Sequence, residues 1–221
     1  MFFIIIKILK RNPFNRLNQI FALFYFSMMM AIFINAVYIT FSDVHLETLA
    51  TLLNITAFYF SCLAAGFLFL CISLLYKPSF MVKTKNQLLF IAFYGGILLY
   101  LFFIEGGAKV VILDTGTQLA PVWNLLFVGY ALSILIATLI ISLLMSVKVY
   151  RDFTDVSLAK RFKYFIIGTI CFYYIPLGVS VSNLINITAI RIFFTFTASV
   201  IFIGAIFIYY GIGVSLSKKR N

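Results

Sequence analysis

The chain has 221 residues, of which 64% are apolar and 10% are charged, and its formal net charge is +11. A soluble domain is about half apolar and about a quarter charged, so this composition excludes soluble enzymes, nucleic-acid-binding domains and secreted disulfide scaffolds. Together with a mean hydropathy of +1.12, it predicts an integral membrane protein.

The chain begins with ten strongly apolar residues, MFFIIIKILK, which are too few to cross a bilayer because a transmembrane helix needs about 20. A secretory signal carries its basic residues before the apolar run, whereas here Lys10, Arg11 and Arg16 come at its end or after it. We therefore expect residues 1–17 to form a short half-inserted or interfacial helix and a basic cytoplasmic turn. The alternative is the end of a further helix whose start is missing.

Six longer apolar runs follow, and each is long enough to cross a bilayer as a helix. They cover residues 18–41, 48–76, 87–104, 121–150, 163–183 and 187–211. None shows the alternating ten-residue pattern of a membrane β-barrel. We expect an all-α polytopic membrane protein with six full transmembrane helices plus the short N-terminal helix. The transmembrane domain spans 18–215, and a basic cytoplasmic tail covers 216–221.

The basic residues predict the orientation. In this topology fifteen of the 17 lysines and arginines lie on the side of the N-terminal turn. The opposite side carries the acidic loop around His45 and the loop 105–120. Since cytoplasmic loops are enriched in Lys and Arg, we expect a multi-pass protein of the cell membrane whose N-terminal turn and C-terminus face the cytoplasm.

The outer loop 105–120 has the sequence EGGAKVVILDTGTQLA. The Asp-Thr-Gly turn signal at 114–116 separates two apolar stretches, which favours either a β-hairpin or a partly apolar loop in the interface. Trp123, at the outer start of the fourth run, is expected to anchor in the membrane interface. The connection at 183–186 is so short that the last two helices are expected to be antiparallel neighbours.

Arg191 is the ionisable residue within the predicted spans and lies near the outer end of the last one. Ionisable residues at membrane depth are expensive and mark functional sites. Three interpretations stay open for it. The side chain snorkels to the interface, it pairs with Glu105 or Asp114, or it binds an anionic ligand from outside.

Uncharged polar residues interrupt the spans, most densely in the last two. Pro176 is expected to kink the fifth span by removing a backbone donor, and the freed carbonyls would help line an outward-opening pocket. The alternative is hydrogen bonding between helices together with an interfacial aromatic belt. The residues that we expect to bind a ligand are Asn124, Tyr130, Tyr173, Tyr174, Asn183 and Arg191.

The sequence contains no residue pattern typical of a catalytic or metal site. The three cysteines lie inside apolar runs, His45 is the one histidine, and no phosphate-binding glycine-rich loop or paired carboxylates occur. We therefore expect no catalytic residues, no metal site, no cofactor and no enzymatic activity.

Asn12, Pro13, Asn15 and Arg16 lead directly into the first long span. This Asn-Pro-x-Asn-Arg sequence resembles the start of the seven-transmembrane sensor region at the N-terminus of many histidine kinases and diguanylate cyclases. The layout of the other spans and loops agrees over residues 1–215. The chain departs from that family in its first helix, which has about ten residues, and in lacking a kinase, PAS or cyclase domain after Arg220.

The resemblance implies a stand-alone sensor or receptor-like module. It would bind a small ligand or membrane cue from the outer side and signal to a separate cytoplasmic protein. Its other expected partners are the lipid bilayer and a second copy of itself. Binding of nucleic acid is not expected. The alternative function is a small permease or a membrane subunit of a transporter complex.

Overall fold

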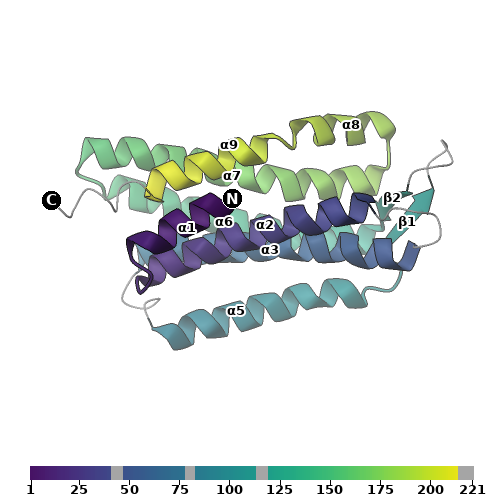
Figure 1. Cartoon of the computed structure of the whole chain (residues 1–221), viewed down its shortest axis with the longest axis horizontal. Helices are drawn as coiled ribbons and strands as arrows, with labels where there is room; N and C mark the ends of the chain where they lie inside the picture. The colour runs from purple at the N-terminus through teal and green to yellow at the C-terminus, as the bar shows by residue number, and fades with distance from the viewer. Residues whose placement is uncertain (41–46, 78–82, 113–118, 214–221) are drawn as a thin grey trace.

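The computed structural model describes residues 1–40, 47–77, 83–112 and 119–213. Figure 1 shows a bundle of roughly aligned helices with a small hairpin at one end. The elements are α1 (Phe2–Arg11), α2 (Arg16–Thr40), α3 (Glu47–Tyr76), α5 (Thr84–Leu99), the 3-10 helix η2 (Tyr100–Phe103), β1 (Ala108–Ile112), β2 (Leu119–Trp123), α6 (Leu125–Arg151), α7 (Val156–Ile185), α8 (Thr188–Thr197), α9 (Val200–Ile208) and the π-helical turn η3 (Tyr209–Gly213).

Six segments among the described residues are long and apolar enough to cross a membrane. This confirms the predicted all-α polytopic fold with six full transmembrane helices and a short N-terminal helix. The last span, Thr188–Ile212, differs from expectation because it is divided into α8 and α9 by a turn at 198–199. Hydropathy does not reveal this interruption, since the residues on both sides of it are apolar.

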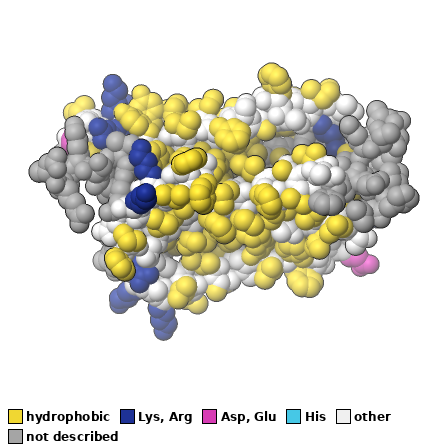
Figure 2. Space-filling model, viewed as in Figure 1, with side chains coloured by type: hydrophobic (Ala, Val, Ile, Leu, Met, Phe, Trp, Pro, Cys, Tyr) yellow, Lys and Arg dark blue, Asp and Glu magenta, His cyan; other side chains and the backbone are white. Residues whose placement is uncertain are grey.

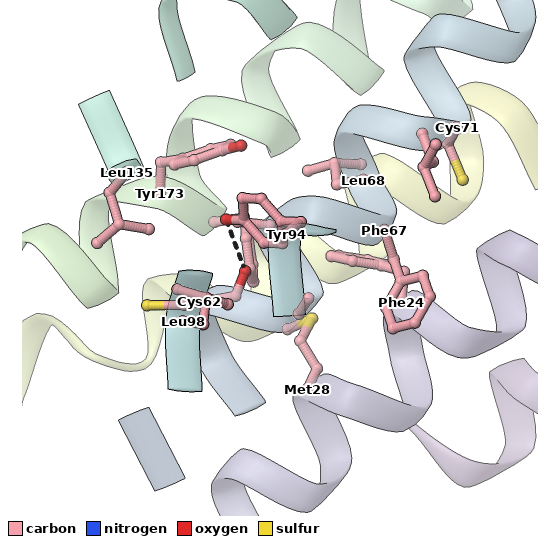
Figure 3. Packing of buried hydrophobic residues seen from close by; sticks show 14 of the residues in the cluster. Phe24, Met28, Cys62, Phe67, Leu68, Cys71, Tyr94, Leu98, Leu135 and Tyr173 are labelled. Carbon is pink, nitrogen blue, oxygen red and sulfur yellow. Dashed lines mark hydrogen bonds between the residues drawn. The ribbon is translucent and has the colours of Figure 1, made fainter. Parts of the chain in front are cut away.

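The central helix is α3, which packs against α2, α5 and α6 and also contacts α7 and both strands. Small residues let the neighbouring helices come close. A Cβ atom at Gly66 would lie 2.5 Å from the Tyr94 ring of α5. The Tyr94 hydroxyl donates a hydrogen bond to the Cys62 carbonyl oxygen at 3.1 Å (Figure 3). This aromatic residue attaches the peripheral helix α5 to the bundle.

The helices α7 and α9 cross with their backbones almost in contact. A Cβ atom at Gly168 would lie 2.7 Å from the Gly204 carbonyl oxygen and 2.8 Å from the Ile208 nitrogen. Only glycine fits such an approach. The prediction that the last two spans are antiparallel neighbours is confirmed, because α7 contacts both α8 and α9 and they run in opposite directions (Figure 1).

The outer loop forms an antiparallel β-hairpin, which was one of the two predicted alternatives. Ala108 is paired with Trp123, and Val110 with Pro121. The predicted turn at 114–116 lies outside the described residues. The predicted start of the fourth span at 121 is wrong, because residues 121–123 complete β2 and α6 begins only at Leu125. Pro121 fits a two-stranded hairpin because an edge strand tolerates a residue without an N–H group.

The short helix α1 exists as predicted and runs beside α2 in the opposite direction (Figure 1). Ile8 is buried against the bundle, and the Lys7 ammonium nitrogen lies 5.7 Å from the centroid of the Tyr209 ring. One face of the helix therefore packs against the bundle, while Phe2 and Phe3 are exposed.

The Asn-Pro-x-Asn-Arg segment is the turn between α1 and α2. The Asn15 side chain accepts a hydrogen bond from the Leu17 nitrogen at 2.9 Å, so it caps the N-terminus of α2. The Asn12 and Pro13 carbonyl oxygens accept hydrogen bonds from Asn18 at 3.0 Å and from Gln19 at 2.8 Å. The Asn12 side chain also accepts a hydrogen bond from the Phe14 nitrogen at 3.2 Å, so both asparagine side chains have structural contacts. Arg16, the first residue of α2, donates to the Gln19 side chain at 3.4 Å.

The charged residues lie at the ends of the bundle. One end, called the basic end below, is where α3 and α6 finish and where α2, α5 and α7 begin (Figure 1). Lysines and arginines gather there, and apolar side chains cover the flank between the two ends (Figure 2). Exposed residues such as Phe93 and Phe196, which are 69% and 85% exposed, are suited to contact lipid. The predicted basic tail, residues 216–221, lies outside the described residues.

Candidate functional site

The most unusual polar group is Arg191, in the first turn of α8. Its Nη2 donates a hydrogen bond to the Pro121 carbonyl oxygen of β2 at 2.5 Å. Tyr38 of α2 lies close enough to interact with it electrostatically. The Arg191 Nε is buried and has no hydrogen-bond partner in the described part of the chain. Since guanidinium groups rarely leave a buried donor unsatisfied, this atom marks a candidate anion-binding position.

The structure bears on the interpretations of Arg191. The side chain is half-buried and contacts a backbone carbonyl oxygen of the hairpin. Glu105 is exposed in the loop before β1, and no ion pair joins it to Arg191. Asp114 lies outside the described residues. Pro121 could not be predicted as the partner, because a backbone carbonyl oxygen has no signal in the sequence.

The hairpin is also attached to α3. The Trp123 Nε1 donates a hydrogen bond to the Asn54 Oδ1 at 3.1 Å, and both side chains are buried. The Phe58 and Phe127 ring centroids lie 4.6 and 4.9 Å from the Trp123 ring. The expectation that Trp123 anchors in the membrane interface is wrong, since this side chain is only 1% exposed. It fixes the second strand to the bundle instead.

Asn124 has a structural position at the start of α6. Its Oδ1 accepts a hydrogen bond from the Phe127 nitrogen at 2.8 Å, and its Nδ2 donates to the Gly106 carbonyl oxygen at 3.1 Å. Its backbone nitrogen donates to the Gly107 carbonyl oxygen at 2.8 Å. The residue caps α6 and closes the hairpin loop. An Asn directly before an apolar run is a helix-start signal that predicts this role.

Two of the predicted ligand-binding tyrosines join neighbouring helices. The Tyr130 hydroxyl of α6 donates to the Ile97 carbonyl oxygen of α5 at 2.8 Å. The Tyr174 hydroxyl of α7 is 2.9 Å from the Thr197 hydroxyl of α8. These contacts correspond to the alternative interpretation, in which polar residues bind helices to one another.

Tyr173 lies deep in the bundle and is fully buried (Figure 3). Its hydroxyl lies near those of Thr138 and Ser142 of α6, but the geometry of a hydrogen bond is not met. The Ser142 and Ser146 hydroxyls are also buried and have no partner among the described residues. Two serines four positions apart within an apolar run indicate one polar helix face, although neither was among the expected site residues.

The predicted ligand-binding residues therefore do not form one pocket. Arg191 lies at the hairpin, Tyr173 lies in the core, and Asn183 is buried in the last turn of α7. Near Pro176, the Ser180 hydroxyl donates to the Pro176 carbonyl oxygen at 2.7 Å, a contact within α7 itself. No group of three His, Cys, Asp or Glu side chains suited to a metal ion occurs in the described residues.

Comparison with known proteins finds no matching family model, no matching curated protein and no matching solved structure. The resemblance of residues 12–16 to the histidine kinase sensor region therefore stays a prediction.

Proposed function

We propose that this membrane protein is a stand-alone sensor module that binds a small anionic ligand at the hairpin end and signals to a separate cytoplasmic protein through its basic end. The observation that carries the proposal is the buried, unpartnered Nε of Arg191. A carboxylate or phosphate oxygen would accept its hydrogen bond and add a charge-assisted interaction.

The contacts of Arg191 suggest how ligand binding would reach the rest of the bundle. The guanidinium joins α8 to the hairpin through Pro121, and the hairpin is joined to α3 through Trp123. A ligand that competes for the guanidinium alters the link between α8 and the hairpin. A signal then requires that the ligand bind one arrangement of these elements more tightly than another. The turn at 198–199 is the hinge that we propose for this change.

Thermal unfolding of the detergent-purified protein tests the proposal. The probes are acetate, succinate and inorganic phosphate, with glycerol as a neutral control. We expect at least one anion to raise the unfolding temperature of the wild type and to have no effect on the Arg191→Gln variant. Lys109→Gln, which removes the other basic residue of the hairpin side, is the matched control and should keep the response. An equal response of the wild type and Arg191→Gln to every anion would refute the proposal.

A small permease or a membrane subunit of a transporter is the second candidate function. One observation favours it. The buried hydroxyls of Ser142, Ser146 and Tyr173 lack partners among the described residues, and polar groups inside a helix bundle are typical of solute pathways. Solute uptake into proteoliposomes, compared with protein-free liposomes, separates the two functions, since a sensor gives no uptake above background.

A further inference from the structure

An open pocket of about 440 Å³ lies at the basic end, between the end of α6 and the first three turns of α7. Its wall contains the ammonium-bearing side chains of Lys160 and Lys163 and the aromatic side chains of Tyr150 and Tyr164. We call it the lysine pocket. No part of it belongs to the Arg191 site, which lies at the opposite end of the bundle.

The charged side chains that line the lysine pocket are both basic. Both lysines are exposed, and no acidic side chain belongs to the described lining. The Lys163 nitrogen lies 5.5 Å from the centroid of the Tyr150 ring, a cation–π distance that holds the ammonium group over the pocket wall. Two cations with no ion pair to any described residue make the pocket complementary to an anionic group.

The pocket is also continuous with an apolar surface. Its α7 residues recur at three- to four-residue spacing from Lys160 through Tyr164 to Ile167, so they share one helix face. Farther along the helix, Ile167 and Ile170 are 45% and 50% exposed and face the flank that contacts lipid. A ligand that fits this surface has an anionic head beside the lysines and an apolar chain along α7.

We propose that the lysine pocket binds the headgroup of an anionic phospholipid, with one acyl chain lying along Ile167 and Ile170. Basic pockets between transmembrane helices at the membrane surface bind such headgroups. A free inorganic anion would use the lysines but gain nothing from the exposed isoleucines, so the apolar continuation favours a lipid. This inference does not depend on the proposed sensor function.

Native mass spectrometry of the detergent-solubilised protein tests the proposal. The protein is titrated with phosphatidylglycerol, with phosphatidylcholine of the same acyl chains, and with inorganic phosphate. The Lys160→Gln/Lys163→Gln variant is compared with Lys83→Gln/Lys85→Gln, which removes two exposed lysines from the basic end outside the pocket.

We expect the wild type to retain one phosphatidylglycerol more tightly than the others, and the pocket variant to bind it about 30-fold more weakly. Each basic residue near an anionic lipid contributes about 1 kcal/mol, and 1.4 kcal/mol is tenfold in affinity. The control variant should keep this lipid. Equal weakening in both variants, equal retention of phosphatidylcholine, or inorganic phosphate bound as tightly as the lipid would each overturn the proposal.

Discussion

Replacing Asn54 with leucine should loosen the hairpin from the bundle. The Asn54 side chain accepts the one hydrogen bond that the Trp123 indole N–H makes, at 3.1 Å, and the indole is 1% exposed. Asn54→Leu keeps a side chain of similar size but leaves that donor buried and unsatisfied, at a cost of about 1–3 kcal/mol. The Phe58 and Phe127 contacts remain, so we expect weaker docking of β2 rather than complete unfolding.

Fluorescence gives a direct readout of this change, because Trp123 is the only tryptophan of the chain. In the wild type we expect weak quenching by acrylamide, and in Asn54→Leu stronger quenching and a lower unfolding temperature. Thr56→Val is the matched control on the same helix, since the Thr56 hydroxyl only donates to the Leu52 carbonyl oxygen of its own helix at 2.7 Å. If the two variants showed the same acrylamide quenching and the same unfolding temperature, the reasoning about the buried indole would be refuted.

Three further pairs of variants test close packing, buried hydroxyls and helix capping by thermal unfolding in detergent. Gly168→Ala should destabilise the protein by about 1–3 kcal/mol, since its Cβ atom would lie 2.7 Å from a backbone oxygen. Gly129→Ala, which meets nothing within 4 Å, should stabilise it by about 0.5–1 kcal/mol, and equal effects of the two would contradict the crossing geometry. Ser142→Ala and Ser146→Ala each remove a buried hydroxyl without a described partner, so neither should lower the unfolding temperature. A clear loss would show that these hydroxyls bind water or a ligand. Asn15→Ala should lower the free energy of unfolding by about 0.5–2 kcal/mol, because the cap of α2 is lost. Asn15→Asp keeps an acceptor oxygen and should retain most of the stability. Equal losses of stability in the two variants would contradict the capping role.

The transmembrane segments can be predicted from the sequence because hydropathy is a local property. A run of about 20 apolar residues has few alternatives to a membrane-spanning helix. Five of the six spans lie within four residues of their expected bounds, whereas the fifth begins at Val156, seven residues before the expected start at 163. The largest errors occur at the ends of the runs. Pro121 and Trp123 are apolar and extend the fourth run, but they pair in the hairpin, and hydropathy cannot distinguish a strand from a helix there.

The face that each helix buries cannot be predicted in the same way. In a soluble helix the polar side chains mark the outer face, but lipid is as apolar as the protein core. In α5 the adjacent aromatics Phe93 and Tyr94 show the difficulty, because the first is 69% exposed and the second 6%. Helix rotation therefore stays undetermined by the sequence.

Finding the candidate site requires knowing which face each helix buries. Arg191 stands out by composition, because it is a charged residue in an apolar run. Its partner lies 70 positions away in the chain and is a backbone oxygen, so only the packed structure identifies it. Asn124 and Tyr174 were expected at a ligand site as polar residues that interrupt the spans, and sequence alone does not show that their hydrogen-bonding groups are used by the fold.

The Gly168–Gly204 crossing determines how force passes between two helices. Where side chains separate two helices, a change of rotamer takes up small displacements. At this crossing the backbone atoms are separated by no side chain, so we expect a tilt of α9 to displace α7 directly. The first turns of α7 carry Lys160 and Lys163, and we expect the same displacement to move the lysine pocket.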